Sequence, residues 1–344
     1  MNILFDINHP AHVHLFRNAI KTLESNGHHI TITARDKDVT LPLLEAYQIP
    51  YVSLSKAQKG LLGLGFELLM RQFKLFSILH KNKIRVCVSA TGACSVHVCK
   101  LLGIPSLVFY DTEHAKLQNA LTVPFATSFI TPSSFKKRYG ENHITYNGVH
   151  DLAYLHPKYF TPDADIAKSL GILNDERFVL IRFVSWGAAH DIGQKRMTLE
   201  FKKTLIDLCS QYAKVFIVSE SPLSPEFEAY RLAVPPEKIL DVLNLATVYI
   251  GDGGSMATEA AILGTPSVFI SSLSAGVFDE LEKDYGLMRA FTPDQESQIY
   301  ATIEELLDED NVKSSWNDKR KKFLEDKVNV TDFMLETILQ YAET

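Results

Sequence analysis

Short apolar runs alternate with longer stretches of helical spacing along this chain, and this alternation limits the fold more than any other sequence feature. The runs are rich in β-branched and aromatic residues, which is typical of strands buried on both faces. After the first run, apolar residues recur on one helical face from Val13 to Leu23. Such βαβ units predict an α/β protein with parallel sheets. The predicted strands are residues 3–7, 30–33, 51–54, 86–89, 106–110, 128–131, 178–184, 215–218, 248–250 and 267–270.

The alternation is interrupted once, at residues 147–162, which contain an Asn-Gly pair, two prolines and no clear period. This composition predicts a linker. A chain of 344 residues is also long enough for two domains of about 150 residues each. We therefore expect an N-terminal domain at 1–155 and a C-terminal domain at 156–329, each doubly wound. An amphipathic helix at 330–344 is expected to pack back on the N-terminal domain.

Composition excludes several other classes of protein. Hydrophobic residues make up 46% of the chain and charged residues 22%, which excludes a disordered or coiled-coil chain. A formal net charge of −6 argues against nucleic acid as a partner. Four cysteines without a CxxC pair predict reduced, buried thiols in a cytoplasmic protein. No secretory signal or membrane-spanning segment is expected, so the chain is predicted to be soluble or peripheral.

The most informative segment follows the predicted strand at 248–250 and opens a helix. The exposed N–H groups of Gly254, Ser255 and Met256, just after Gly253, would hold a phosphate or diphosphate at the positive end of the helix dipole. Glu259 lies one turn after Ser255 on the same face, where a carboxylate could accept hydrogen bonds from the vicinal hydroxyls of a ribose. In the ordinary interpretation, Ser255 only caps the helix and Glu259 is a solvated charge.

A single arginine interrupts the apolar strand predicted at 178–184. A guanidinium is rare in such a strand unless it is paired or reaches an anion. Arg182 is therefore a candidate ligand for the diphosphate, and a structural ion pair is the alternative.

Three histidines follow the first predicted strand within six residues: His9, His12 and His14. At the carboxyl end of a strand they could form a metal site or an acid–base site, or they could cap and pack the first helix. We expect no metal site, because no ordered set of further His and Asp ligands follows. His12 is the candidate that we retain.

A second polar loop follows the strand predicted at 106–110. A carboxylate here, Glu113, could deprotonate an acceptor hydroxyl, and His114 beside it is a second acid–base group. The alternative is that Asp111 and Glu113 cap the next helix.

Residues 59–85 predict a long apolar helix with several basic residues. The ordinary interpretation is a helix that covers the sheet, since Glu67 interrupts the basic side. The alternative is contact with a membrane surface or with a lipid-carried acceptor.

The two-domain layout and the turn at residues 252–259 resemble the GT-B superfamily of nucleotide-sugar enzymes. Within it, the chain is similar to the UDP-N-acetylglucosamine 2-epimerases and to the lipid-linked N-acetylglucosaminyl transferase of peptidoglycan synthesis. Residues 5–12 (FDINHPAH) and 251–256 (GDGGSM) look like a prokaryotic family known mainly as a domain of unknown function. The resemblance implies a GT-B fold, with two tandem doubly wound, Rossmann-like domains facing each other across a cleft.

The resemblance also implies roles for single residues. The turn from Gly253 to Met256 corresponds to the binding site of the UDP diphosphate, with Arg182 and Gly187 on the same nucleotide side. Glu259 matches the glutamate that holds the ribose hydroxyls. Glu113 matches a catalytic glutamate of the 2-epimerases, and His12 falls near a loop histidine of these relatives.

One departure from these relatives decides between reactions. The 2-epimerases carry a further catalytic aspartate in the loop corresponding to residues 90–93, where this chain has no carboxylate. They also use a histidine–arginine pair early in the second domain; it is not evident here, although His190 lies nearby. An epimerase must remove and return protons, whereas a transferase needs one base and stabilisation of the departing diphosphate.

We therefore expect an inverting, metal-independent glycosyltransferase with a UDP-sugar donor, no cofactor and a lipid-linked or cell-envelope acceptor. The alternatives are a UDP-N-acetylglucosamine 2-epimerase, a UDP-sugar hydrolase, and a non-catalytic protein that binds sugar nucleotides.

Overall fold

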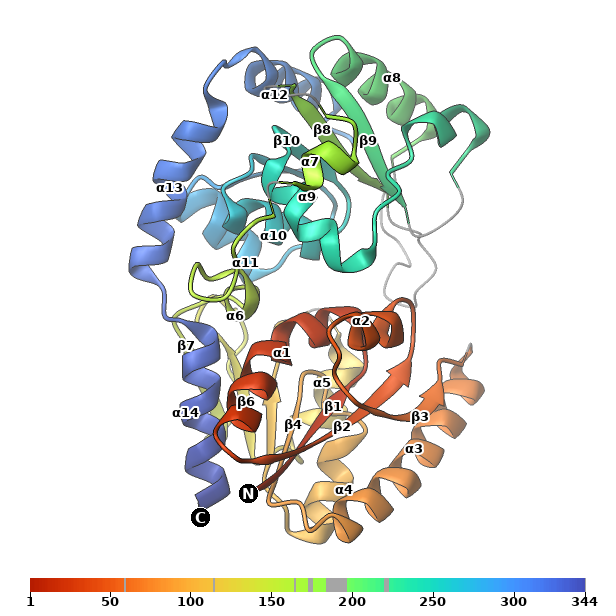
Figure 1. Cartoon of the computed structure of the whole chain (residues 1–344), viewed down its shortest axis with the longest axis vertical. Coiled ribbons are helices and arrows are strands. Elements are labelled where there is room, and N and C mark those ends of the chain that lie inside the picture. Colours follow the sequence, from red (N-terminus) through yellow and green to blue (C-terminus); the bar gives the residue numbers. More distant parts are fainter. Residues whose placement is uncertain are drawn as a thin grey trace. The chain divides into compact units, whose positions relative to one another are not determined.

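The computed structural model describes residues 1–58, 60–113, 115–163, 165–172, 176–183, 197–219 and 223–343. The chain divides into two compact units (Figure 1). The N-terminal unit comprises Met1–Tyr159 together with Lys327–Thr344, and the C-terminal unit comprises Phe160–Asp326. The last segment of the chain therefore belongs to the N-terminal unit.

The N-terminal unit is built on a seven-stranded parallel sheet with the order β3-β2-β1-β4-β5-β6-β7. Its strands are β1 (Asn2–Ile7), β2 (His29–Asp36), β3 (Val52–Lys56), β4 (Val86–Ser89), β5 (Ser106–Phe109), β6 (Ser128–Pro132) and β7 (His143–Tyr146). Its helices are α1 (Pro10–Ser25), α2 (Thr40–Ala46), α3 (Leu61–Lys81), α4 (Ser95–Leu102), α5 (Lys116–Thr122), α6 (Leu152–Leu155) and α14 (Val330–Glu343). Helix α1 packs against α2, α6 and α14, whereas α3 packs against α4.

The C-terminal unit is built on a five-stranded parallel sheet with the order β12-β11-β10-β8-β9. Its strands are β8 (Phe178–Phe183), β9 (Lys214–Ser219), β10 (Val248–Gly251), β11 (Ser267–Ile270) and β12 (Met288–Phe291). Its α-helices are α7 (Ile166–Ser169), α8 (Leu199–Ser210), α9 (Ile239–Leu245), α10 (Gly254–Leu263), α11 (Gly276–Asp279), α12 (Glu296–Asp308) and α13 (Val312–Asp326). Three further short helical turns are η2 (Pro225–Tyr230), η3 (Pro236–Lys238) and η4 (Glu280–Asp284).

Strands lie wherever the apolar runs predicted them, because continuous apolar runs must be covered on both faces. Strands β4, β5, β10 and β11 are buried along their whole lengths. Helix α1 begins at Pro10, three residues before the apolar face that predicted it: His9 is its extended N-cap residue, and Pro10 occupies the first turn. Both sheets are parallel, so the α/β prediction is confirmed.

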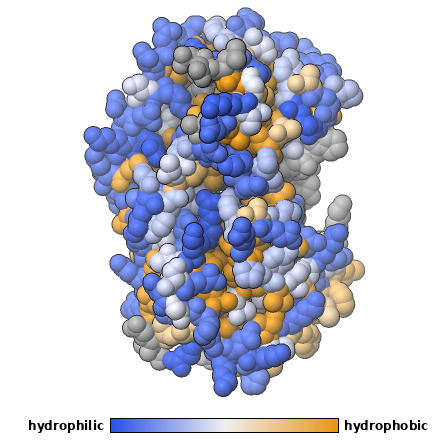
Figure 2. Space-filling model, in the orientation of Figure 1, coloured by the Kyte–Doolittle hydropathy of each residue, from blue (hydrophilic) through white to orange (hydrophobic). Residues whose placement is uncertain are grey.

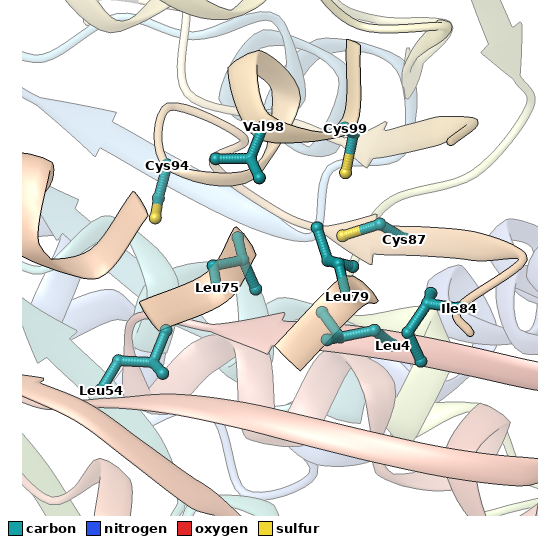
Figure 3. Close-up of a cluster of buried hydrophobic side chains, with 9 residues drawn as sticks. All are labelled: Leu4, Leu54, Leu75, Leu79, Ile84, Cys87, Cys94, Val98 and Cys99. Carbon is teal, nitrogen blue, oxygen red and sulfur yellow. The ribbon is translucent and has the colours of Figure 1, made fainter. Parts of the chain in front are cut away.

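The core between α3, α4 and the sheet contains three of the four cysteines. Figure 3 shows Cys87 of β4 and Cys94 and Cys99 near α4 among leucines of α3 and β1. All four cysteines are buried and free, as the sequence predicted. Burial raises the pKa of Cys94 to about 12, so this thiol stays protonated at neutral pH.

The structure differs from the sequence prediction at residues 147–162. The first part of this segment is not a linker, because it forms α6, whose residues Leu152 and Leu155 are fully buried. Thr331 of α14 donates a hydrogen bond to the carbonyl of Ala153 at 2.6 Å, which ties the end of the chain to α6. Strands β7 and β12 were also not predicted.

Candidate functional site

Each sheet has a topological switch point, where successive strands are added on opposite sides of one central strand. In the C-terminal unit, β9 and β10 flank β8, and in the N-terminal unit β2 and β4 flank β1. In doubly wound folds, ligands bind at the carboxyl ends of the two strands beside this point. Arg182, near the end of β8, is in register with Gly251 at the end of β10. The sequence-predicted arginine and glycine turn therefore meet at the switch point of their sheet.

Helix α10 starts directly after this turn. Gly253 is its N-cap residue, has an extended backbone and provides no side-chain cap. The amides of Gly254, Ser255 and Met256 form the first helical turn, where N–H groups have no partner within the helix. Ser255 is exposed and lies inside the helix, so the interpretation of Ser255 as the cap is wrong. This end of α10 can bind an anion through backbone amides.

Two glycines of the turn are required by packing within the protein. A Cβ atom added at Gly251 would collide with the hydroxyl of Tyr249. A Cβ atom at Gly254 would lie 2.7 Å from Cζ of Phe278. The lack of side chains at these two positions is therefore explained by the fold itself, and the anion-binding capacity lies in the amides.

Glu259 is buried in the second turn of α10, with 7% of its surface exposed. It is not the solvated charge of the ordinary interpretation. The pKa of Tyr249 is raised, mainly by burial. The charge of Arg182 acts against this rise, and the charges of Asp252 and Glu259 add to it. The charges of Arg182, Asp252 and Glu259 therefore all act on the Tyr249 hydroxyl.

Two cations approach the turn. Arg182 donates a hydrogen bond from Nη1 to Sδ of Met256 at 2.8 Å, so its guanidinium reaches the first turn of α10. Lys202 of α8 lies with Nζ 4.4 Å from the ring centre of Phe183. Burial lowers the pKa of Lys202, whereas the negative charge of Asp252, in the turn, raises it. Sequence reasoning missed Lys202, because nothing in the spacing of α8 separates it from its neighbour Lys203. Gly187 lies outside the described residues.

The switch point of the N-terminal unit is spanned by side-chain hydrogen bonds. Asn8 follows β1 and donates from Nδ2 to Oγ1 of Thr91, which follows β4, at 3.1 Å. The same Nδ2 donates to Oδ2 of Asp6 at 3.0 Å. Thr33 of β2 donates to Oδ1 of Asp6 at 2.9 Å. A buried polar network therefore fixes the loop between β1 and α1, just before His12.

Helix α3 completes this network with two charged side chains, Glu67 and Arg71. Arg71 donates to Asn8 Oδ1 and forms an ion pair with Asp6 at 3.4 Å. Glu67, one turn earlier, receives a bidentate pair of hydrogen bonds from Arg35, each at 2.7 Å. Glu67 and Arg71 are therefore buried, unlike Lys74 and Lys81 of the same helix. Their partners lie far away in the sequence, so no local pattern predicts these pairs.

His12 is a buried, neutral donor in the first turn of α1. Its Nδ1 accepts a hydrogen bond from the backbone N–H of Asn8 at 3.2 Å, which assigns the proton of the neutral ring to Nε2. Burial lowers its pKa well below the usual value, and the nearby His9 and His150 lower it further. His12 therefore offers an N–H donor at neutral pH. Sequence reasoning missed His150, whose Nδ1 is hydrogen-bonded to the Tyr146 hydroxyl at 2.8 Å.

The other two histidines of the first loop have structural roles. His9 accepts a hydrogen bond from the Ala11 amide at 3.2 Å and caps α1. His14 packs between the rings of Tyr47 and Tyr154. Burial lowers the pKa of His14 to about 3, with a smaller effect from Arg17. Among the described residues, no group of three or more His, Cys, Asp and Glu side chains could hold a metal ion.

Glu113 lies in the loop after β5, on the same edge of the sheet as Asn8. The next helix, α5, has Ala115 as its N-cap residue, without a side-chain cap. Asp111 accepts a hydrogen bond from the neighbouring Thr112 at 3.0 Å. The N-cap position of α5 is therefore not occupied by Asp111 or Glu113. His114 lies outside the described residues.

Comparison with known proteins places the chain in a family. The sequence profile described as "Protein of unknown function (DUF354)" matches residues 1–343. The chain belongs to this family. This DUF354 chain is also 28% identical, over 281 residues, to an uncharacterized protein of Methanocaldococcus jannaschii; the match covers 78% of this chain and 81% of that protein.

Solved structures show the same fold at low sequence identity. UDP-GlcNAc 2-epimerase from Neisseria meningitidis, bound to UDP-GlcNAc, is similar with a TM-score of 0.67 and 12% identity, covering 99% of this chain and 100% of that chain. The spinosyn forosaminyltransferase SpnP is similar with a TM-score of 0.68 and 14% identity, covering 99% of each chain. The DUF354 chain therefore has the GT-B fold of two Rossmann-like domains, as its sequence predicted.

Proposed function

We propose that this protein is a glycosyltransferase that uses a UDP-sugar donor. The observation that carries the proposal is the meeting of Arg182 with the open first turn of α10 at the switch point of β8 and β10. Backbone amides and a guanidinium are the groups that bind a diphosphate. Glu259, buried one turn later, provides the carboxylate for the ribose hydroxyls.

The same groups would stabilise the leaving UDP. When the bond between the anomeric carbon and the diphosphate breaks, its electron pair remains on the diphosphate oxygen. The amides of α10 and the side chains of Arg182 and Lys202 would then stabilise a growing negative charge. In this proposal a divalent metal is not required.

The N-terminal unit would supply the acceptor side. Glu113 is the proposed base that removes the proton from an acceptor hydroxyl as its oxygen bonds to the anomeric carbon, with inversion. His12 is better suited to donate a hydrogen bond to the sugar, because its Nδ1 lone pair is occupied by the Asn8 amide. His114 and Gly187 remain proposed members of the site by sequence resemblance. A lipid-linked or cell-envelope acceptor is proposed on the same basis.

Titration calorimetry with UDP and with uridine tests the nucleotide site. We expect Glu259→Gln to weaken both ligands by about tenfold or more, which corresponds to about 1.4 kcal/mol, because both contain the ribose. Glu305→Gln on the exposed side of α12 is the matched control and should leave both affinities unchanged. Equal affinities for wild type and Glu259→Gln would remove Glu259 from the site.

The reaction is tested by incubation with UDP-N-acetylglucosamine in the absence of an acceptor. A transferase should leave the sugar nucleotide essentially intact over many hours. Accumulation of the 2-epimer, or rapid release of UDP, would replace the transferase by an epimerase or a hydrolase. Nucleotide binding that is unchanged in Glu113→Gln, without turnover on any acceptor, would indicate a binding protein.

A further inference from the structure

Helix α3 has two apolar faces, and the sheet covers only one of them. Its inward face carries Leu75 and Leu79, which are fully buried in the core shown in Figure 3. Leu62, Phe66 and Phe73 lie on the opposite face, with 92%, 67% and 74% of their surfaces exposed. A helix that is apolar on both faces normally has a partner on each.

The exposed residues form one continuous stripe. The stripe consists of Leu62, Phe66, Leu69, Met70, Phe73 and Phe76, at the spacing of three and four residues that keeps side chains on one side of a helix. Figure 2 shows hydrophobic side chains along this edge of the N-terminal unit, over the position of α3 in Figure 1. A contiguous apolar patch of this kind on a surface indicates an interaction site.

The exposed charges of α3 and of the segment that follows it have one sign. On α3 and the segment that follows it, the exposed charged residues are Lys74, Lys81, Lys83 and Arg85. The acidic residue of α3, Glu67, is turned inward and paired with Arg35 at 2.7 Å. In a chain with a net charge of −6, the helix that carries the apolar stripe therefore exposes only basic charges.

We infer that this face of α3 binds to the surface of an anionic lipid bilayer. Aromatic and aliphatic side chains inserted at the headgroup boundary and lysines facing anionic headgroups are the recognised combination for an interfacial helix. Pairing with a second copy is disfavoured, because a two-fold interface on this face would bring the same basic residues together. No helix in the described ranges is both long and apolar enough to cross the bilayer.

Vesicle sedimentation of the full chain, without nucleotide, tests the inference. Vesicles of phosphatidylcholine with 30% phosphatidylglycerol are compared with vesicles of phosphatidylcholine alone, each at low and high salt. We expect binding to the anionic vesicles, loss of about tenfold or more on neutral vesicles, and weakening by salt. Equal binding to both vesicles, or no binding to either, would overturn the inference.

Two pairs of variants separate the face of α3 from general charge. Lys81→Glu/Lys83→Glu should weaken binding by about tenfold or more. Lys321→Glu/Lys322→Glu, on exposed positions of α13, makes the same change in net charge and should bind as wild type. Equal losses in both pairs would overturn the assignment to α3. These assays use no nucleotide, so their failure leaves the proposed transferase site untouched.

The apolar stripe is tested by substitution and by a fluorescent reporter. Phe66→Ser/Phe73→Ser should abolish binding to anionic vesicles while circular dichroism remains native, because both rings are exposed. As a second measurement, Phe73→Trp should show a blue-shifted emission and quenching by brominated lipids, whereas Leu199→Trp on exposed α8 should not. Absence of quenching at residue 73 would contradict insertion. A concentration-dependent dimer that Phe66→Ser/Phe73→Ser abolishes would assign the face to a second copy instead.

Discussion

The guanidinium of Arg71 lies 3.4 Å from the carboxylate of Asp6, and both side chains are almost completely buried. The two residues are brought together from α3 and β1. Asp6 also accepts hydrogen bonds from Thr33 and Asn8, so the ion pair belongs to the network at the end of β1, just before α1. Breaking such a pair from one side leaves a charge in a medium of low polarity.

We therefore expect Arg71→Met to lower the free energy of unfolding by about 3–5 kcal/mol, because Asp6 remains buried without its cation. Urea unfolding of the full chain, followed by circular dichroism, measures this loss. Asp6→Asn/Arg71→Met should recover much of it, since the isolated charge is removed as well.

The control for this prediction is an exposed ion pair in the same unit. Lys158 lies 2.7 Å from Asp332, with about half of each side chain exposed. Lys158→Met should leave the urea midpoint nearly unchanged, because solvent replaces the interaction. If Arg71→Met behaved like Lys158→Met, the buried network would contribute little to stability.

Protonation of His14 should make the protein less stable in mild acid. Its pKa in the folded state is about 3, below the ordinary value of about 6.5, because burial excludes the charged ring. The contribution is complete above pH 6.5 and is lost as the pH falls toward 3, at about 1.4 kcal/mol per pH unit. We expect His14→Phe to show a smaller loss of stability than wild type over this range.

Urea midpoints measured at intervals between pH 7 and pH 4 test this prediction. The exposed His29 provides the control, and His29→Phe should follow the wild-type profile. Parallel profiles for wild type and His14→Phe would show that His14 does not cause the acid sensitivity.

Gly254→Ala should destabilise the start of α10 by about 1–3 kcal/mol, because the new methyl group would lie 2.7 Å from Cζ of Phe278. Phe278→Leu should relieve the overlap, so the alanine should cost less in that background. A double-mutant cycle of unfolding free energies measures the coupling between the two positions. Additive effects would mean that the backbone of the turn shifts and that the new methyl group does not contact Phe278.

Arg182→Gln should weaken UDP binding by about tenfold and leave uridine binding unchanged, because the proposed contact is with the diphosphate. Calorimetry with both ligands measures this difference. Arg177→Gln is the matched control, since Arg177 precedes the opposite, amino end of β8. An equal loss for uridine would show that Arg182 acts on the turn itself, through Met256, and not on the phosphates.

The sequence predicted the parallel sheets because buried strands leave an apolar run that few other structures produce. It also predicted the helix that follows the glycine turn, since this signal is local. The capping of α1 by His9 was one of two alternatives that the sequence left open. Strand β7 was missed because most of it is only partly buried and its pattern is not apolar throughout.

The direction of side chains on α3 could not be predicted, because apolar residues occur all around this helix. Periodicity identifies a buried face only where the other face is polar. Glu67 and Arg71 therefore resembled surface charges in the sequence. Their partners could not be identified, because Arg35 and Asp6 lie on distant strands, β2 and β1. The same limit applies to Lys202, which approaches the glycine turn only through the packing of α8.

Helix α14 returns to the N-terminal unit after the whole C-terminal unit has been completed. Tyr341 of α14 shares a hydrogen bond of 2.7 Å with Ser128, and Thr331 holds the carbonyl of Ala153. During synthesis, the N-terminal unit therefore cannot bury its apolar surface completely until α14 has left the ribosome. The C-terminal unit can complete its folding before that point. Premature stop codons near residue 327 would thus damage the half of the molecule that was translated first.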